Sequence, residues 1–289
     1  MANDVSHNSR RGLLLVSPPF LTTLVLLAGP LGAIILFSFW TQDYLTLNTD
    51  FTIKNYVEAA QDPIYGLLLG RSLLVAGAVT LLTVITAFPV AYFISFHVKP
   101  SRKSLWLFLI TIPFWTSYLI RVFLWKVVLG FNGVINSGLI ELGIIDAPIT
   151  FILYNLNAVI ITLAHAFAPF AILPIFVALE KIDRLLLEAS RDLGETRVAT
   201  FFRVTLPLAM PGVVAATLIV FIPVIGDYIT PRLVGGPGGL MIANMIQTQF
   251  LKLNNAPMGA ALAVISMISV TVIATLFVWL NRRFLKVRS

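Results

Sequence analysis

Residues 73–96 read LLVAGAVTLLTVITAFPVAYFISF and set the class of structure. The stretch contains no Asp, Glu, Lys or Arg, and an apolar helix of roughly 20 residues is long enough to cross the hydrocarbon core of a bilayer. The whole chain is 58% hydrophobic and 11% charged, with a mean hydropathy of +0.93. A water-soluble domain needs far fewer apolar residues to fill its core. The sequence therefore predicts an integral membrane protein.

Five further apolar stretches continue this pattern on both sides of the first. Lipid offers backbone groups no water, so continuous apolar runs cross it as helices, whereas the strands of a barrel would alternate in polarity. The stretch nearest the N-terminus, Leu13–Trp40, is too long for the core of a signal peptide, and we expect a permanent helix there. The loops are too short for a separate domain, so we expect an all-α integral membrane protein with one domain over residues 1–289. Its six predicted transmembrane helices are Leu13–Trp40, Leu73–Phe96, Leu105–Leu129, Phe151–Leu179, Leu206–Ile229 and Gly259–Leu280.

Basic residues mark one side of the membrane. Of the 20 Lys and Arg residues, 14 fall in the two ends of the chain and in the second and fourth connections. Lys54, Arg71, Arg232 and Lys252 fall in the other connections. Cytoplasmic segments carry the excess of basic residues in membrane proteins, so both termini are predicted to be cytoplasmic. The 14 are Arg10, Arg11, Lys99, Arg102, Lys103, Lys181, Arg184, Arg191, Arg197, Arg203, Arg282, Arg283, Lys286 and Arg288.

Several kinds of chemistry are absent from the sequence. It has no cysteine, no G-x-x-x-x-G-K-[ST] phosphate loop and no G-x-S-x-G motif, which argues against a thiol or serine nucleophile and a nucleotide cradle. His7, His97 and His165 lack metal-ligand spacing. The net charge of +7 reflects the excess of Lys and Arg on one side of the membrane, and we do not take it as a sign of nucleic-acid binding. We expect no enzyme active site and no cofactor in this chain.

The connection over about residues 180–207, here called the coupling loop, is predicted to hold two short helices. Asp183–Leu193 and Glu195–Val204 both show helical spacing of apolar residues. Gly194 separates them, and a glycine there can take the left-handed backbone conformation that ends one helix and turns the chain. A short helical knob of this kind can dock into a cleft on another protein. A second short helix, Ile242–Leu251, is predicted at the membrane interface.

The coupling loop resembles the signature of ABC-transporter permeases, Glu-Ala-Ala, three residues, Gly, nine residues, Ile, one residue, Leu-Pro. Five of the seven defined positions are identical, and Ser190 and Val204 replace an Ala and the Ile. The resemblance implies a site that couples this chain to a separate ATPase. The implied coupling residues are Glu188, Ala189, Ser190, Gly194, Leu206 and Pro207.

Three ionisable residues fall at membrane depth, where charge is costly and often functional. Asp227, followed by Tyr228, offers a carboxylate beside an aromatic ring, which suits a cationic substrate. The alternative is a structural ion pair of Asp227 with Arg232 or Arg121, and the sequence leaves both interpretations open. Arg121 and Lys126 would repel a polycation unless they are neutralised or reach the outer interface, as we expect of Lys126.

The segment Pro113-Phe-Trp-Thr-Ser-Tyr-Leu-Ile-Arg121 places Phe114, Trp115 and Tyr118 on one side of a predicted helix. Taken alone, these aromatic residues are typical of core packing. The segment resembles the Pro-x-Trp-Thr-x-x-Leu-Ile-Arg stretch of spermidine/putrescine ABC permeases, in the first of their two permease types. Residues 132–136, 186–194 and 233–237 support the same resemblance.

The resemblance implies a type I ABC importer permease in a bacterial inner membrane, forming half of a polyamine path. The implied partners are a second permease, two cytoplasmic ATPase subunits that bind ATP and Mg²⁺, an extracytoplasmic solute-binding protein and membrane lipid. Asp227, Tyr228, Trp115, Tyr118 and Arg121 are the candidate path residues. Arg121 keeps an amino-acid-like or anionic solute open. A secondary transporter acting without an ATPase and a membrane-embedded assembly factor are the rival classes, and the coupling loop argues against both.

Overall fold

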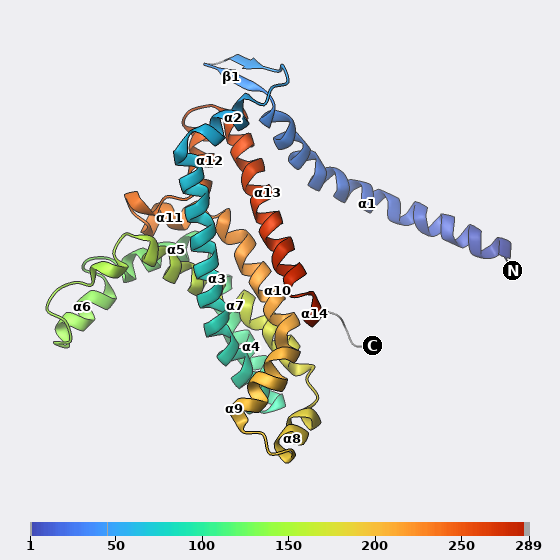
Figure 1. Cartoon of the computed structure of the whole chain (residues 1–289), viewed down its shortest axis with the longest axis vertical. Helices are drawn as coiled ribbons and strands as arrows, with labels where there is room; N and C mark the ends of the chain where they lie inside the picture. Colours follow the sequence, from blue (N-terminus) through green and yellow to red (C-terminus); the bar gives the residue numbers. More distant parts are fainter. Residues whose placement is uncertain (1, 45, 286–289) are drawn as a thin grey trace. The chain divides into compact units, whose positions relative to one another are not determined.

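The computed structural model describes residues 2–44 and 46–285, and the side chains from residue 16 onward (Figure 1). Helices make up almost all of it. The elements in chain order are α1 (Ala2–Ser38), β1 (Thr41–Asp43), β2 (Thr46–Asn48), α2 (Lys54–Gln61), α3 (Pro63–His97), α4 (Pro100–Thr111), η1 (Ile112–Trp115), α5 (Tyr118–Val128), α6 (Val134–Glu141), η2 (Thr150–Ile152), α7 (Leu156–Glu180), α8 (Arg184–Asp192), α9 (Arg197–Thr200), η3 (Phe201–Thr205), α10 (Leu206–Ile225), α11 (Ile229–Val234), η4 (Pro237–Gly239), α12 (Ile242–Leu251), α13 (Ala256–Leu280) and α14 (Arg282–Leu285).

The described residues pack as two units. The first falls within Met1–Pro63 and Ile246–Ile265, and the second within Ile64–Met245 and Ser266–Ser289. In the first unit, β1 and β2 form an antiparallel hairpin in which Gln42 pairs with Leu47. The buried Asn55 side chain donates to the Ser38 and Trp40 carbonyl oxygens at 3.0 and 2.6 Å, and so fixes α2 to the end of α1. That residues 1–289 form one permease domain stays a prediction.

The second unit is built around the packing of α7 against α10. Gly212 of α10 allows this approach: a Cβ at this position would lie 2.5 Å from both the Cβ of Ala178 and the carbonyl oxygen of Pro174 on α7. Only glycine leaves room for two helices at that separation. Leu163 and Ile175 of α7 and Val220 of α10 are fully buried here. Helix α11, which follows α10, packs on α5 and α7.

Five helical stretches among the described residues are long and apolar enough to cross a membrane: Val16–Ser38, Pro63–His97, Leu156–Glu180, Arg197–Ile225 and Ala256–Leu280. The one remaining predicted span, the third (Leu105–Leu129), is not one straight helix. It is a pair, Pro100–Trp115 and Tyr118–Val128, bent by 87°. Pro113 lies in the 3₁₀ turn η1, and Thr116 and Ser117 are extended, with ψ of 148° and 138°. Extended residues end the helical ladder, so the helix must restart in a new direction.

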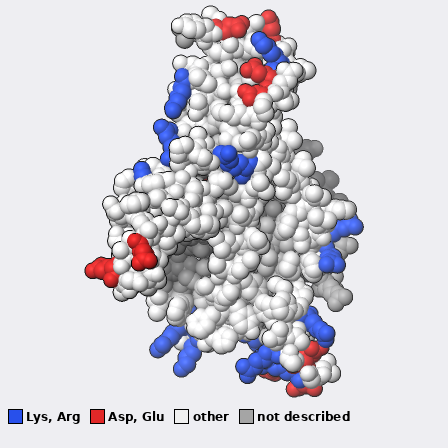
Figure 2. Space-filling view, turned by 60° about the vertical axis from the view of Figure 1, so that its left-hand side comes forward, with Lys and Arg blue, Asp and Glu red and all other residues white. Residues whose placement is uncertain are grey.

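The other predicted boundaries shift for local reasons. The fourth span begins at Leu156 rather than Phe151 because the Asn155 side chain caps it, accepting from the amides of Asn157 and Ala158. Helix α12 has the predicted bounds Ile242–Leu251. Of the residues predicted to be cytoplasmic, Lys286 and Arg288 lie outside the described residues, as do the side chains of Arg10 and Arg11. Figure 2 shows a cluster of Lys and Arg, with Asp and Glu beside them, at the lower end of the view, where Figure 1 places α8 and α9.

Candidate functional site

Gly194 ends the first helix of the coupling loop in the predicted way. Helix α8 starts after Asp183, whose carboxylate accepts from the Leu185 amide at 3.0 Å. At its other end Gly194 has φ of +88°. The Gly194 amide donates to the Arg191 carbonyl at 2.9 Å and the Glu195 amide to the Ser190 carbonyl at 3.2 Å. These two bonds form the Schellman arrangement, in which a left-handed glycine closes the helix and reverses the chain.

The second predicted helix of the loop, Glu195–Val204, is not a separate element. Thr196 caps α9 by accepting from the Ala199 amide at 3.2 Å. From there α9, η3 and α10 form one helical stretch, Arg197–Ile225. The prediction missed this continuity because Leu206-Pro207 looked like a boundary, whereas a proline is accommodated in the first turn of α10. The coupling loop therefore leads straight into the fifth span.

A buried pair of hydroxyls holds α8 to α9. The Ser190 and Thr200 hydroxyl oxygens lie 3.0 Å apart, and both residues are buried, with 8% and 3% of their surface exposed. Ser190, at the position where the signature has alanine, therefore faces the interior of the loop, and its coupling role stays a prediction. Arg203 and Glu195 form an ion pair within the same loop. No sequence pattern points to Thr200, because the pairing depends on how α8 folds back against α9.

The coupling loop exposes a group of large apolar side chains among its charged ones. Glu188, Ala189 and Gly194 are exposed, and Leu206 and Pro207 are half-buried. Leu187 is buried, and the half-buried Phe201 packs edge-on against Phe88 of α3 at 5.5 Å. The sequence left open which apolar side chains face outward, and the structure assigns them. The exposed set, here called the outer patch, is Leu185, Leu186, Leu193, Val198 and Phe202, with exposed fractions of 49–86%.

Glu180, at the end of α7, joins the coupling loop to three spans. Its Oε1 accepts from Ser95 of α3 at 2.6 Å and from Lys103 of α4 at 2.6 Å. Arg184, in the first turn of α8, lies 3.5 Å from the same oxygen and donates to the Ser95 carbonyl at 2.9 Å. The Arg184 guanidinium also lies over the Phe96 ring at 4.0 Å. One carboxylate thus connects the ends of α3, α4, α7 and α8.

A second cluster lies where α5 meets α11. Tyr118 donates its hydroxyl hydrogen to Asp227 Oδ2 at 2.7 Å and lies 2.8 Å from the Thr230 hydroxyl oxygen. The other oxygen of Asp227 accepts from the Ile229 amide at 2.9 Å. Asp227 and Tyr118 are half-buried and Thr230 is buried. The half-buried carboxylate is therefore fixed in place by neutral donors.

Arg121 lies near the rings of Tyr118 and Phe114. Its guanidinium carbon is 6.0 Å from the centroid of the Tyr118 ring and 4.8 Å from that of Phe114. The residue is 9% exposed, donates to the Thr116 carbonyl at 3.4 Å, and has a buried Nε without a partner. Among the described residues Arg121 forms no ion pair, and Asp227 takes its hydrogen bonds from Tyr118 and from backbone amides. The proposed Asp227–Arg121 ion pair is therefore not formed.

The remaining candidate path residues are placed differently. The break before Tyr118 separates it from Phe114 and Trp115, so the three aromatic residues do not share one helix face as predicted. Trp115 is 77% exposed and packs edge-on against Phe108 at 5.7 Å. Tyr228 presents its backbone carbonyl to the Asn244 side chain at 2.7 Å. The cluster thus unites Tyr118, Asp227 and Arg121 and adds Thr230, while path roles for all five candidates stay predictions.

Comparison with known proteins gives consistent results. A family model described as "Binding-protein-dependent transport system inner membrane component" matches residues 87–286. The spermidine/putrescine transport system permease protein PotB of Haemophilus influenzae is 40% identical over 80% of this chain and 79% of its own. PotB of Escherichia coli is 39% identical over 78% of this chain and 82% of its own. The inner membrane ABC transporter permease protein YdcU of Escherichia coli is 32% identical over 91% and 87%.

Solved structures share the fold at low sequence identity. A bacterial alginate ABC transporter, solved with an alginate pentasaccharide-bound periplasmic protein, matches 98% of this chain and 98% of its own with a TM-score of 0.74 at 18% identity. The MetNI methionine ABC transporter, in an inward-facing conformation, matches 78% of this chain and 99% of its own with a TM-score of 0.55 at 20% identity. These likenesses establish the all-α fold of an ABC importer permease.

Proposed function

Because this chain belongs to the family of binding-protein-dependent transport system inner membrane components, we propose that it is a permease subunit of an ATP-driven polyamine importer. It is a multi-pass inner-membrane protein. The observation that carries the proposal is the pair of sites on one chain: an exposed coupling loop joined to the spans, and a half-buried carboxylate beside an aromatic ring. PotB, named for spermidine and putrescine, is similar over four-fifths of the chain.

The outer patch of the coupling loop suits docking to a separate ATPase. A group of exposed apolar side chains on a charged loop marks a protein interface, and Glu188 supplies a polar edge to it. In this proposal two cytoplasmic subunits bind ATP and Mg²⁺, and this chain carries no cofactor. A second permease and an extracytoplasmic binding protein complete the complex, and both termini of this chain are cytoplasmic.

Movement of a docked subunit can reach the spans by two routes. The continuous helical stretch Arg197–Ile225 connects the loop to the fifth span without a break. The Glu180 carboxylate connects α8 to the ends of α3, α4 and α7. The first route is rigid because it is an unbroken helical stretch. The second is rigid because charge-assisted hydrogen bonds are stronger than neutral ones and hold their geometry. Alternating access would follow from these helix ends moving together.

Asp227 is the proposed contact for a protonated amine. Its Oδ2 accepts one hydrogen bond from Tyr118, and a carboxylate oxygen can accept a second from an ammonium group. The Tyr118 ring offers the same group a cation–π contact. Arg121 lies on Phe114 rather than on Asp227, so it leaves this carboxylate uncompensated. Of the five candidate path residues, only Arg121 favours an anionic solute.

The test is uptake of labelled spermidine and putrescine into cells that lack their own polyamine systems. The permease is co-expressed with its genomic neighbours. Asp227→Asn keeps the shape of the side chain and removes its charge, and a hydrogen bond to a charged group contributes roughly 1.5–3 kcal/mol. We therefore expect uptake efficiency to fall about 10- to 100-fold, whereas Asp146→Asn, an exposed site away from the cluster, should leave uptake unchanged.

Three results would contradict parts of the proposal. Polyamine uptake that persists without the ATPase subunits would indicate a secondary transporter. An assembled, ATP-hydrolysing complex that takes up no polyamine would assign another small solute to the permease. Equal uptake by wild type and Asp227→Asn would remove Asp227 from the path while leaving the importer intact.

A further inference from the structure

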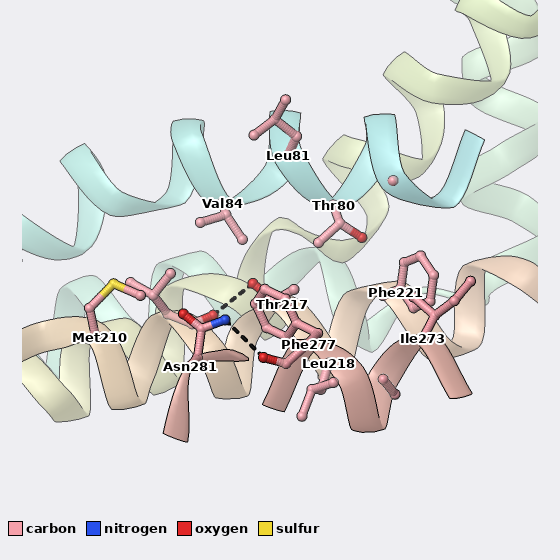
Figure 3. A pocket seen from close by; sticks show the side chains of 13 residues that line it. Thr80, Leu81, Val84, Met210, Thr217, Leu218, Phe221, Ile273, Phe277 and Asn281 are labelled. Carbon is pink, nitrogen blue, oxygen red and sulfur yellow. Dashed lines mark hydrogen bonds between the residues drawn. The ribbon is translucent and has the colours of Figure 1, made fainter. Parts of the chain in front are cut away.

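A groove in the second unit lies away from both sites described above. It has a volume of about 370 Å³ and is walled by α3, α10 and the second half of α13 (Figure 3). Thr80 and Val84 of α3 lie across from Met210 and Phe221 of α10, and Phe277 of α13 closes a side. This volume is in the range of roughly 300–1,000 Å³ typical of ligand pockets. None of the coupling-loop or path candidates lines it.

The groove offers a ligand almost no polar partners. Thr217 and Asn281, two of its polar side chains, already donate to the carbonyl oxygens of Val213 and Phe277, each at 2.9 Å. The third polar side chain of the groove is the buried Thr80, whose hydroxyl has no hydrogen-bond partner among the described residues. A polar ligand needs several convergent groups to replace its water, and one hydroxyl is too few. The walls belong to helices that can span a membrane, so the groove fits a hydrocarbon chain.

Positive charge lies at one end of the groove. Asn281 lines that end and is followed directly by Arg282 and Arg283 in α14, which packs against α10. Both arginines are exposed, and neither forms an ion pair among the described residues. Their guanidinium groups lie over the rings of Trp279 and Phe284 at 5.3 and 4.7 Å. The charge asymmetry of the sequence places this end on the cytoplasmic side.

We propose that the groove binds one acyl chain of an anionic phospholipid from the cytoplasmic leaflet, with the headgroup at Arg282 and Arg283. Basic residues beside a pocket between membrane helices recognise anionic headgroups, and each methylene buried in the groove adds to the attraction. The apolar groove and the two arginines fit one lipid, because the acyl chain of a phospholipid enters the bilayer directly beneath its headgroup. This inference is independent of the transported solute.

The test is native mass spectrometry of the full-length chain, purified with its co-expressed partner subunits and offered phosphatidylglycerol or phosphatidylcholine with matched acyl chains. We expect one retained phosphatidylglycerol per chain. Gly77 lines the groove, and a Cβ there meets no atom within 4 Å, so Gly77→Leu starts its side chain in open space within the groove and should abolish retention. Gly66→Leu is the matched control on α3: its Cβ is equally free, and the residue lies outside the groove.

The headgroup contact has its own variant. One basic residue near an anionic membrane surface contributes roughly fivefold in affinity, so Arg282→Gln with Arg283→Gln should lower the preference for phosphatidylglycerol over phosphatidylcholine about 30-fold. Arg102→Gln, at an exposed cytoplasmic position away from the groove, should not change it. Three results would overturn the proposal: equal retention of the two lipids by wild type, unchanged retention in Gly77→Leu, or cross-linking to another subunit in place of lipid. For the last, Ala274→Cys puts a single thiol for a photoactivatable label into the groove of a chain that has no cysteine.

Discussion

Replacement of Gly194 tests whether the turn that ends α8 shapes the coupling loop for a partner. The φ of +88° at this glycine is unfavourable for any residue with a Cβ. A Cβ there would meet no atom within 4 Å, so no steric clash adds to the cost, which is conformational alone. A left-handed backbone costs an L-residue about 1–2 kcal/mol, which corresponds to a factor of roughly 5–30 in an equilibrium constant.

The affinity for the ATPase subunits should therefore fall in an order set by the side chain at residue 194. Asn visits left-handed conformations more easily than Ala, and a β-branched residue does so least. We expect affinity for the co-expressed ATPase subunits, measured on the detergent-solubilised permease, to fall in the order Gly, Asn, Ala, Val. ATP-dependent uptake should fall in the same order.

Gly143 provides the matched control for this series. Its φ is +67° and a Cβ there also meets nothing within 4 Å, but it lies in the loop after α6. Gly143→Val should therefore lower stability by a similar amount without weakening ATPase binding. If Gly194→Val binds the ATPase as wild type does, or if Gly143→Val weakens binding equally, the proposed role of the turn is wrong.

Three further predictions concern packing in the second unit. Ser190→Ala leaves the buried Thr200 hydroxyl without its partner and should lower the free energy of unfolding by about 1 kcal/mol, measured by thermal unfolding. Adding Thr200→Val should restore most of this loss. If the effects of the two substitutions simply add in the double mutant, the Ser190–Thr200 hydrogen bond is refuted. Glu180→Gln removes the counter-ion of Lys103, whose side chain is 15% exposed, and should lower stability by roughly 1.5–3 kcal/mol; because the two act together, adding Lys103→Gln should cause little further loss. Gly212→Val forces α7 and α10 apart and should cost at least about 1–3 kcal/mol; an unchanged unfolding temperature would contradict the close helix contact.

Local features were the most predictable part of this protein. The apolar run Leu73–Phe96 lies within α3, and Ile242–Leu251 is α12 with the same bounds. The turn at Gly194 follows from the lack of a Cβ at that position. The bend in the third span was missed although Pro113 is visible in the sequence, because most prolines in membrane helices are accommodated without an 87° change in direction.

The sequence by itself determined the membrane class, the apolar segments that form the spans and the glycine turn of the coupling loop. These depend on lipid excluding polar backbone and on the conformations open to single residues, and both act within one segment. Only the tertiary structure decided that Tyr118 reaches Asp227 across 109 positions, that Ser190 faces Thr200, and that Glu180 joins four helix ends. Such pairings depend on where helices cross and which faces meet. Those are set by side-chain packing between distant segments.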